Sequence, residues 1–385
     1  MDGKLAVVGV GSVGSMALWQ AARRSGTRAG EVVGFEARTT GHTRSAVGGD
    51  TRLFRMTYRG GTGFAPLLER ANVLWPELEA ETGHEILTRC GGLSIGARDG
   101  EYLPELLATA TANGTPFEFL DHDELAARYP QHRLRPDDCA LFDPRAGFVR
   151  TDRAVVAATE AARAAGAEVL EGTGIDEIHE EADSVVLRCG TRTWRFERVI
   201  VTAGGWSARL LPPPVAAAVH PRRNYLTWFV ARRPEEFTPE RFPVFIRIES
   251  DRSLYGAPST DGVTVKATLD GRSTPAEHAD RIRRELTEEE ITETQETVGE
   301  FLPGLVPSIV RADAFPDLFT ADHAPLLGSL PGRPRTVFAT GFSGLGFKIA
   351  PASAEAAVAI AFGEPATEAN GLHPNRFDTT SPSLR

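Results

Sequence analysis

A glycine-rich segment near the N-terminus is the first part of the chain with evident chemical potential. Its spacing is G-x-G-x-x-G, and its residues are Gly9, Gly11, Ser12, Val13 and Gly14. Between a strand and a helix, the first glycine permits a tight turn and the second lets a pyrophosphate approach the backbone. The third lets helix and strand pack closely. The amides that open the helix then face the phosphates, so the segment predicts a dinucleotide site.

Glu36 strengthens this prediction. It directly follows the apolar segment 31–35, where a carboxylate would accept hydrogen bonds from the hydroxyls of a ribose. The alternative is a glycine-rich turn that binds nothing. The strand, the helix and the acidic residue are all present, and together they argue against that alternative.

Two further glycine-rich segments favour FAD over NAD. The segment 199–207 resembles a flavoprotein element that passes the dinucleotide a second time, and it contains Ala203, Gly204 and Trp206. The third segment contains Gly341, Gly344, Leu345, Gly346, Phe347 and Lys348. The helix after it could face the pyrimidine edge of a flavin and stabilise the anionic reduced ring. Three backbone approaches suit the long FAD molecule, and an NAD dehydrogenase would not need the last one.

Hydrophobic patterning predicts the elements that position these segments. Strands are expected at 5–10, 31–35, 167–170, 184–188, 198–202 and 336–340. Helices are expected at 15–24, 65–82, 152–166 and 351–362, with Pro76 a possible kink in the second. The glycine- and threonine-rich stretch 39–50 is predicted to be a loop.

Two other regions have a different texture. Residues 86–145 are interpreted as short strands and turns, and residues 216–319 as β-rich, with strands at 224–231, 244–249 and 262–268 and a helix at 286–301. We therefore predict an α/β fold in which a Rossmann-like FAD-binding domain carries an inserted β-rich (α+β) substrate domain. The FAD-binding domain would comprise 1–85, 146–215 and 320–385, and the substrate-binding domain 86–145 and 216–319.

Composition limits the remaining possibilities. The chain has 385 residues, 41% hydrophobic and 24% charged, with a formal net charge of −10, which argues against nucleic acid or an anionic membrane as the main partner. Its three cysteines are far apart and form no C-x-x-C pair, and no export signal or membrane-length apolar run is evident. We expect a soluble cytoplasmic protein, a monomer or small homo-oligomer, without a metal site.

Three segments occur in a characteristic order along the chain. They are Gly49-Asp-Thr-Arg-Leu-Phe-Arg55 followed by Tyr58, Leu254-Tyr-Gly-Ala-Pro258 followed by Lys266, and Gly341-Phe-Ser-Gly-Leu-Gly-Phe-Lys348. With these segments the chain resembles, nearly end to end, the monomeric sarcosine oxidase/N-methyltryptophan oxidase family. That family lies within the wider D-amino-acid-oxidase-like flavoproteins.

The resemblance implies roles for several residues. Arg55 and Lys348 match the pair that holds a substrate carboxylate, a role that suits two converging cations. Lys266 matches the lysine that activates oxygen beside the flavin. Arg52 and Tyr255 match residues that line the flavin and the substrate. Further cofactor contacts are expected from Arg44, Ser45, Thr51 and Ile175. For each charged residue, the alternative is a solvated side chain at the surface.

Three positions depart from the family. Phe315 occupies the position of the cysteine that usually links FAD covalently, so we expect FAD to be bound non-covalently. Gly48 and Asp270 stand where relatives have histidines. We expect Gly48 to leave space for a larger substrate, and Asp270 to meet a second polar or cationic group. Alternatively, Asp270 pairs with Lys266 or Arg272, or is a solvated turn residue.

The function we predict is FAD-dependent oxidation of a small amine or amino acid to an imine, with molecular oxygen reduced to hydrogen peroxide. One alternative is a dehydrogenase of the same fold that passes its electrons to a carrier. Another is a relative that binds flavin without catalysis. The presence of Arg55, Lys266 and Lys348 together argues against the second alternative.

Overall fold

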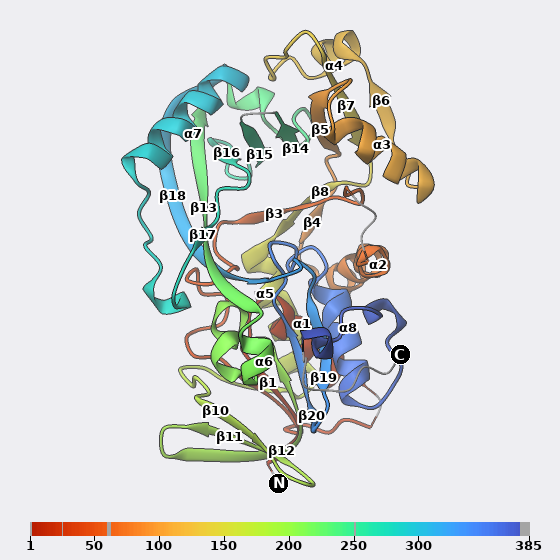
Figure 1. Cartoon of the computed structure of the whole chain (residues 1–385), viewed down its shortest axis with the longest axis vertical. Coiled ribbons are helices and arrows are strands. Elements are labelled where there is room, and N and C mark those ends of the chain that lie inside the picture. Colours follow the sequence, from red (N-terminus) through yellow and green to blue (C-terminus); the bar gives the residue numbers. More distant parts are fainter. Residues whose placement is uncertain (1, 25, 60–62, 250–251, 378–385) are drawn as a thin grey trace.

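The computed structural model describes residues 2–24, 26–59, 63–249 and 252–377, and these build two large sheets and one small sheet (Figure 1). Eight strands form the first sheet, in the order β10-β11-β12-β1-β2-β9, with β20 beside β12 and β19 beside β20. Their bounds are β1 (Gly3–Val8), β2 (Val32–Phe35), β9 (Glu168–Leu170), β10 (Glu177–Glu180), β11 (Val185–Cys189), β12 (Arg192–Val201), β19 (Leu326–Leu330) and β20 (Arg333–Thr340). The predicted FAD-binding domain also includes residues 378–385, which lie outside the described residues.

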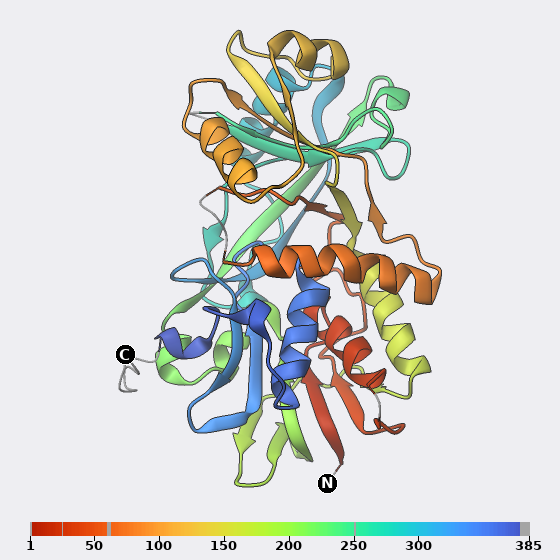
Figure 2. The same cartoon turned by 90° about the vertical axis from the view of Figure 1, so that its right-hand side faces the viewer.

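The central strand β1 shows why this sheet is buried. Leu5, Ala6 and Val7 have no exposed surface, and β1 pairs in parallel with both β2 and β12. Parallel strands of this kind are covered on both faces. Four helices lie together on one face (Figure 2), and they are α1 (Ser12–Ala22), α2 (Ala65–Thr82), α5 (Thr151–Ala164) and α8 (Ala350–Ala361).

The second sheet has nine strands, in the order β17-β13-β16-β15-β14-β5-β7-β6, with β18 beside β13. The strands are β5 (Gly92–Ala97), β6 (Glu118–Leu120), β7 (Asp138–Asp143), β13 (Val219–Ala231), β14 (Val244–Ile248), β15 (Ser253–Ala257), β16 (Thr264–Leu269), β17 (Thr274–Pro275) and β18 (Leu305–Thr320). The helices packed around it are α3 (Tyr102–Ala112), α4 (His122–Arg128) and α7 (Glu288–Phe301). The long antiparallel pair β13 and β18 runs from this sheet down to the first one (Figure 1).

A three-stranded sheet lies between the two larger ones. It consists of β3 (Thr51–Phe54), β4 (Leu87–Thr88) and β8 (Gly147–Arg150), in the order β3-β8-β4. The remaining short helices are η1 (Gly204–Leu210), α6 (Pro213–Ala216), η2 (Pro234–Glu236), η3 (Ala279–Arg281), η4 (Thr367–Ala369) and η5 (Pro374–Phe377). The strands of the first sheet come from segments predicted for one domain, and those of the second sheet from segments predicted for the other, except for the last residue of β18. The domain boundaries themselves stay a prediction.

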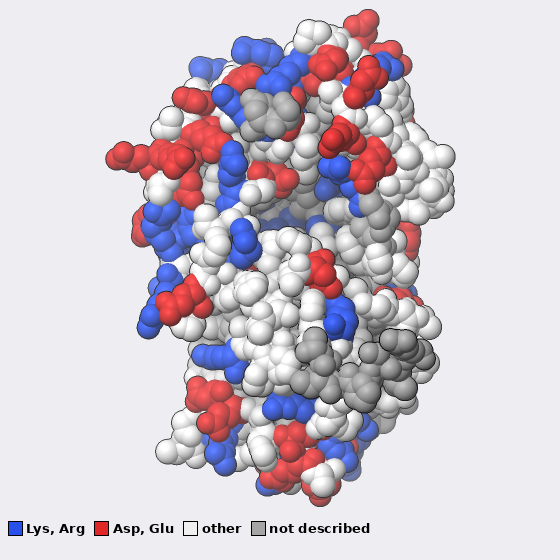
Figure 3. Space-filling view, viewed as in Figure 1, with Lys and Arg blue, Asp and Glu red and all other residues white. Residues whose placement is uncertain are grey.

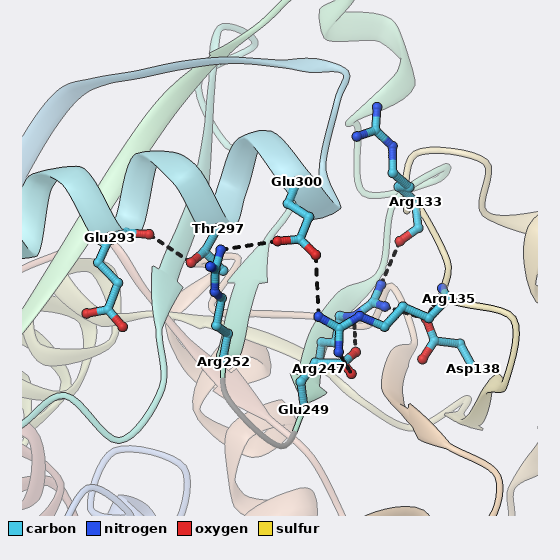
Figure 4. A network of polar contacts seen from close by, with 9 residues as sticks. All are labelled: Arg133, Arg135, Asp138, Arg247, Glu249, Arg252, Glu293, Thr297 and Glu300. Carbon is cyan, nitrogen blue, oxygen red and sulfur yellow. Dashed lines mark hydrogen bonds and ion pairs between the residues drawn. The ribbon is translucent and has the colours of Figure 1, made fainter.

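One buried charge network fixes α7 against the second sheet (Figure 4). Arg247 on β14 is fully buried, forms ion pairs with Asp138 and Glu249, and donates to the Arg133 carbonyl at 2.8 Å. Arg135 then joins Glu249 to Glu300 of α7. Breaking the buried pair of Arg247 and Asp138 would leave an uncompensated charge, so its loss should be strongly destabilising.

Most predicted elements occur where expected, and α2 spans Ala65–Thr82 with Pro76 inside it. The interpretation of 86–145 as only short strands and turns was wrong, because α3 and α4 lie there. Pro104 and two threonines obscured α3, although its buried residues Leu103, Leu106 and Ala110 follow helical spacing. Within the described part of the chain, no helix is long and apolar enough to cross a membrane.

Candidate active site

The first glycine-rich turn joins β1 to α1 in a geometry that only glycines permit. Gly9 has a φ of +93°, and a Cβ on Gly14 would lie 1.8 Å from the Gly9 carbonyl oxygen. Helix α1 begins after Gly11 and has no side-chain cap. Its first amides therefore face the cleft without a side chain of their own helix to satisfy them.

Glu36 lies buried at the end of β2. Its carboxylate accepts hydrogen bonds from the amides of Val10, at 3.0 Å, and Arg38, at 2.9 Å, and His42 Nε2 lies 3.4 Å from Oε1. Burial acts to raise the pKa of Glu36, but His42 and the two amides outweigh it and hold that pKa below its usual value. The carboxylate is therefore ionised and suited to accept hydrogen bonds.

A cavity of about 300 Å³ follows these residues. Its predicted lining residues are Gly9, Gly11, Ser12, Glu36, Ser45, Ile175, Ala203, Gly204 and Trp206. Arg38, His42 and Asp280 also line it and were not predicted. Asp280 accepts a hydrogen bond from Trp206 Nε1 at 2.7 Å, so η3 closes this end of the cavity.

A second cavity of about 500 Å³ continues from the first. Its predicted lining residues are Ser12, Val13, Thr51, Arg52, Arg55, Gly204, Tyr255, Lys266, Asp270, Phe315, Gly344, Leu345, Gly346, Phe347 and Lys348. The two cavities share the lining residues Ser12, Ala46, Thr202, Gly204, Pro316 and Asp317, so they form one elongated cleft. On the face seen in Figure 3 the molecule is hollowed between its upper and lower parts, with Lys or Arg atoms at the bottom.

Two cations face one aromatic ring in the second cavity. The Arg55 guanidinium carbon lies 4.7 Å, and Lys348 Nζ 5.1 Å, from the centre of the Tyr58 ring. Among the described residues, neither cation forms an ion pair with a carboxylate. Burial, with Arg55 beside it, lowers the pKa of Lys348 to about 7. Burial also raises the pKa of Tyr58 to about 12, so its hydroxyl stays protonated.

Lys266 and Arg52 both bind the loop before β3. Lys266 Nζ donates to the Gly49 carbonyl at 3.0 Å and to the Thr51 carbonyl. Arg52 donates to the carbonyls of Ala46, Gly48 and Thr51, each at 2.8 Å. Both cations line the cavity, and their hydrogen bonds also fix the loop that forms its wall.

Asp270 lies in the same cavity, just beyond the end of β16. Lys266, on the same strand, and Leu269, its last residue, line the cavity as well. The two partners considered from sequence are engaged elsewhere, because Lys266 binds the loop and Arg272 pairs with Glu293. The proposed pairing with either of them is therefore not seen.

The expectation that Gly48 leaves an empty space was wrong. A Cβ at Gly48 would lie 2.2 Å from Cε1 of Phe315 and 2.5 Å from the Thr43 carbonyl oxygen. The Phe315 ring fills the space above Gly48 and packs with Leu226, Trp228 and Tyr255. Gly48 is thus a close-packing position, and the cavity does not extend there.

Three other predicted residues do not line the cleft. Arg44 is exposed, and Gly14 packs α1 against β1. Gly341 has a φ of +66°, and a Cβ there would lie 2.8 Å from Thr320 Cγ2, so it serves the turn.

Asp317 is the main residue that the sequence analysis missed. It lies where the two cavities meet, and its carboxylate accepts hydrogen bonds from the amides of Leu318, at 2.8 Å, and Gly344, at 2.9 Å. Burial raises its pKa. An acid between Phe-Pro and Leu-Phe is an unusual position for a solvated side chain, and this was the available signal.

The cleft fits a long dinucleotide. One glycine of each glycine-rich segment, namely Gly11, Gly204 and Gly344, has no described heavy atom within 4 Å of a built Cβ. All three line the cleft, so the backbone is open to a ligand at three places along its length. Together with Glu36, this defines a protein that binds an extended dinucleotide such as FAD.

Comparison with known proteins gives the family. The family described as DAO, FAD dependent oxidoreductase, matches residues 4–360, and the chain belongs to it. It is therefore an FAD-dependent oxidoreductase of the amine and amino acid oxidase type. The sequence resemblance and the predicted α/β fold class are both confirmed.

Three relatives illustrate the match. N-methyl-L-tryptophan oxidase of Salmonella enteritidis PT4 (strain P125109) is 29% identical over 383 residues, covering 98% of this chain and 99% of the relative. The solved structure of NikD, an unusual amino acid oxidase, has a TM-score of 0.85 at 21% identity and covers 96% of this chain and 97% of its own. Glycine oxidase from Geobacillus kaustophilus has a TM-score of 0.81 at 20% identity, with 97% and 98% covered.

Proposed function

We propose that the protein oxidises a C–N bond of a small amine or amino acid and uses molecular oxygen as its electron acceptor. The substrate loses two electrons and two protons to give an imine, and oxygen takes them up as hydrogen peroxide. The bound FAD supplies the two-electron redox chemistry. The observation that carries the proposal is the pair of cations, Arg55 and Lys348, in a cavity continuous with the dinucleotide cleft.

Arg55 and Lys348 are proposed to hold the substrate carboxylate. They approach the same Tyr58 ring, and no described carboxylate neutralises either one by an ion pair. Two cations this close, neither of them ion-paired although Asp270 lines the same cavity, favour an anionic ligand. The glycine-rich segment 344–346 lines the same cavity as these two cations.

This role can be tested with methylthioacetate, a thioether acetate that cannot be oxidised at a C–N bond. Its binding should perturb the flavin spectrum of the holoenzyme, and Arg55→Ala should weaken binding by about 2 kcal/mol or more, the scale of a charge-assisted hydrogen bond. Arg59→Ala is the matched control, because Arg59 is an exposed neighbour that pairs with Glu105. Undiminished binding in Arg55→Ala would remove Arg55 from the site.

Lys266 is proposed to promote the reaction with oxygen. A cation at this place would stabilise the negative charge that develops on oxygen as electrons arrive. Burial, together with Arg52, lowers the pKa of Lys266 well below its usual value, and Asp50 opposes this shift. The hydrogen bonds to two loop carbonyls favour the protonated form.

FAD is proposed to bind without a covalent link. Phe315 lines the cavity and offers no nucleophile. All three cysteines, Cys90, Cys139 and Cys189, are free and line neither cavity. Acid precipitation should release the yellow colour into the supernatant, and colour retained in the pellet would contradict this.

The free cysteines also support a cytoplasmic location, which we propose on that ground.

Asp270 is proposed to meet a second polar or cationic group of the substrate. It lines the cavity near Arg55 and Lys348, and its charge raises the pKa of both. Asp270→Asn should therefore weaken the preference for side chains that carry such a group. Turnover of sarcosine and of bulkier N-alkyl or cyclic amino acids can be compared in the wild type and in Asp270→Asn. Sarcosine as the best substrate of both would contradict this role.

A further inference from the structure

The turn that carries Asp50 has a strained backbone. Asp50 has a φ of 59°, in the left-handed region, and the Thr51 amide donates to the Gly49 carbonyl at 2.6 Å. A three-residue turn closed in this way around a positive φ is rare among turns. Non-glycine residues in such a conformation persist only where surrounding contacts impose it, and they concentrate at functional sites.

Two neighbouring elements impose this conformation on Asp50. Arg311 Nη2, on β18, lies 2.5 Å from Asp50 Oδ2, and the Thr151 amide at the start of α5 donates to the Asp50 carbonyl at 2.9 Å. The Arg311 guanidinium also lies 3.8 Å from the centre of the Trp228 ring. The side chains of the ion pair are 44% and 37% exposed. An exposed pair of this kind contributes little to global stability, so variants that remove it should keep the fold.

The two carbonyls on either side of Asp50 bind Lys266. Its Nζ donates to Gly49, at 3.0 Å, and to Thr51. It also lies 5.8 Å from the Trp228 ring, whose centre Arg311 approaches more closely. The position of Lys266 Nζ therefore depends on the direction in which the Gly49 and Thr51 carbonyls point. The turn at Asp50 sets that direction.

We propose that Asp50 and Arg311 are positioning residues that hold the 49–51 turn, and through it the Lys266 ammonium, for the reaction of the reduced enzyme with oxygen. This inference rests on the proposed role of Lys266. Arg311 disfavours the charged form of Lys266 and Asp50 favours it. Arg311 therefore does not favour the charged form of Lys266 directly, and its ion pair with Asp50 is what links it to the turn.

The test separates the oxygen reaction from substrate binding. Holoenzyme reduced with dithionite is mixed with oxygen, and its reoxidation rate is measured in wild type, Arg311→Gln, Asp50→Asn and Asp50→Ala. We expect reoxidation to slow by about tenfold, the low end of the loss when a supporting partner is removed. Asp50→Ala should lose most, because alanine tolerates a positive φ less well than asparagine. Methylthioacetate binding should stay within about twofold of wild type, because Arg55 and Lys348 are unchanged.

A second readout does not depend on the flavin. Hydrogen exchange of the Thr51 amide in the holoenzyme should become faster in the Arg311 and Asp50 variants, because this amide closes the turn. Arg128→Gln is the matched control. Arg128 also forms an exposed ion pair, with Glu118, and lies over the Tyr129 and Phe142 rings far from the turn. It should change neither reoxidation nor exchange at Thr51.

The variant Lys266→Met, measured in parallel, separates the positioning role of Asp50 and Arg311 from the proposed role of Lys266 itself. If it slows reoxidation while the Asp50 and Arg311 variants behave as wild type, the positioning role is wrong and the proposed function stands. If Lys266→Met itself reoxidises at the wild-type rate, the role of Lys266 is wrong and the inference fails with it. If methylthioacetate binding falls in parallel with reoxidation, the turn only maintains the fold, and positioning is contradicted.

Discussion

Lys348 gives the cavity a charge that titrates near neutral pH. Burial is the main cause of its pKa of about 7, and Arg55 adds to it, while Asp270 and Asp317 oppose it. A carboxylate binds the protonated form better. Its affinity should therefore be highest below about pH 7 and fall as pH rises through that value, by up to about tenfold per pH unit.

The dissociation constant of methylthioacetate, measured over a range of pH, checks this expectation, because the ligand has no amine that titrates. Lys348→Arg is the control, since its guanidinium stays charged and should remove the decline above neutrality. A pH-independent affinity in the wild type would show that Lys348 is either not in contact with the carboxylate or not shifted.

Individual site residues were predictable where the sequence places them in a motif. Arg55, Lys266 and Lys348 occur in segments whose order indicated their place, and all three line the cavity. Asp317 and His42 were missed because their place in the cleft depends on contacts with residues of other elements. Gly344 lies 27 residues after Asp317 along the chain. Gly48 was misinterpreted for the same reason, since its neighbour Phe315 comes from β18.

At the scale of elements, the loop before β3 and strand β18 fit together through Gly48 and Phe315. A Cβ at Gly48 meets the Phe315 ring at 2.2 Å, so Gly48→Ala should destabilise the protein by about 1–3 kcal/mol, the usual cost of overpacking. Phe315→Leu should relieve much of this cost, giving a favourable coupling in a double-mutant cycle.

Denaturant unfolding of the four proteins of this cycle provides the measurement. Gly63→Ala is the control, because Gly63 also lacks a positive φ but has no described atom near its built Cβ, and it should cost little. If the losses in the free energy of unfolding of Gly48→Ala and Phe315→Leu simply add in the double variant, the close contact between these two residues is contradicted.

The connection between α4 and β7 contains a buried histidine with its own pH dependence. His132 stacks on Phe242 and meets Phe245 edge-on, and neither of its ring nitrogens has a described partner. Burial, with Arg247 nearby, lowers its pKa to about 3. Below the unfolded-state pKa of about 6.5, the unfolded chain binds a proton that the native state does not, so stability falls as pH decreases from there towards 3.

His132→Phe should make the free energy of unfolding less dependent on pH in this window while keeping the aromatic contacts. Urea unfolding at several pH values between neutrality and about pH 4 would show this. His122→Phe is a suitable control, because His122 is exposed on α4. If the free energy of unfolding depends on pH to the same extent in the wild type and in His132→Phe, the role given to His132 is wrong.

Elements with strong periodicity were predictable, and those with mixed environments were not. Helix α5 has a clear buried face and was located within one or two residues. Strand β18 was not predicted as a single long strand, because its first half is largely exposed and carries the charged residue Arg311. Its pairing with β13 over many residues stabilises it, and such long-range pairing leaves little signal in the local sequence.

At the scale of the whole molecule, the cleft lies where the two large sheets meet. Arg55 follows β3, Lys266 lies on β16 and Lys348 precedes α8, so each cation comes from a different part of the chain. The long strands β13 and β18 connect the upper sheet to the dinucleotide end and carry Tyr225 and Phe315 to the cavity (Figure 1). This arrangement gives one elongated cleft that suits a dinucleotide at one end and, as we propose, a small anion at the other.

The central claim is oxidation of an amine or amino acid with oxygen as acceptor. The most direct measurement is to mix the yellow holoenzyme, without oxygen, with a panel of amines, amino acids and N-methyl or cyclic amino acids, and then to admit oxygen. We predict that at least one amine bleaches the flavin and that oxygen restores the colour with an equimolar yield of hydrogen peroxide. If dithionite bleaches the flavin but none of these compounds does, amine oxidation is contradicted. If an amine bleaches it but oxygen restores the colour only slowly and without peroxide, the protein is a dehydrogenase and the oxygen role proposed for Lys266 is wrong.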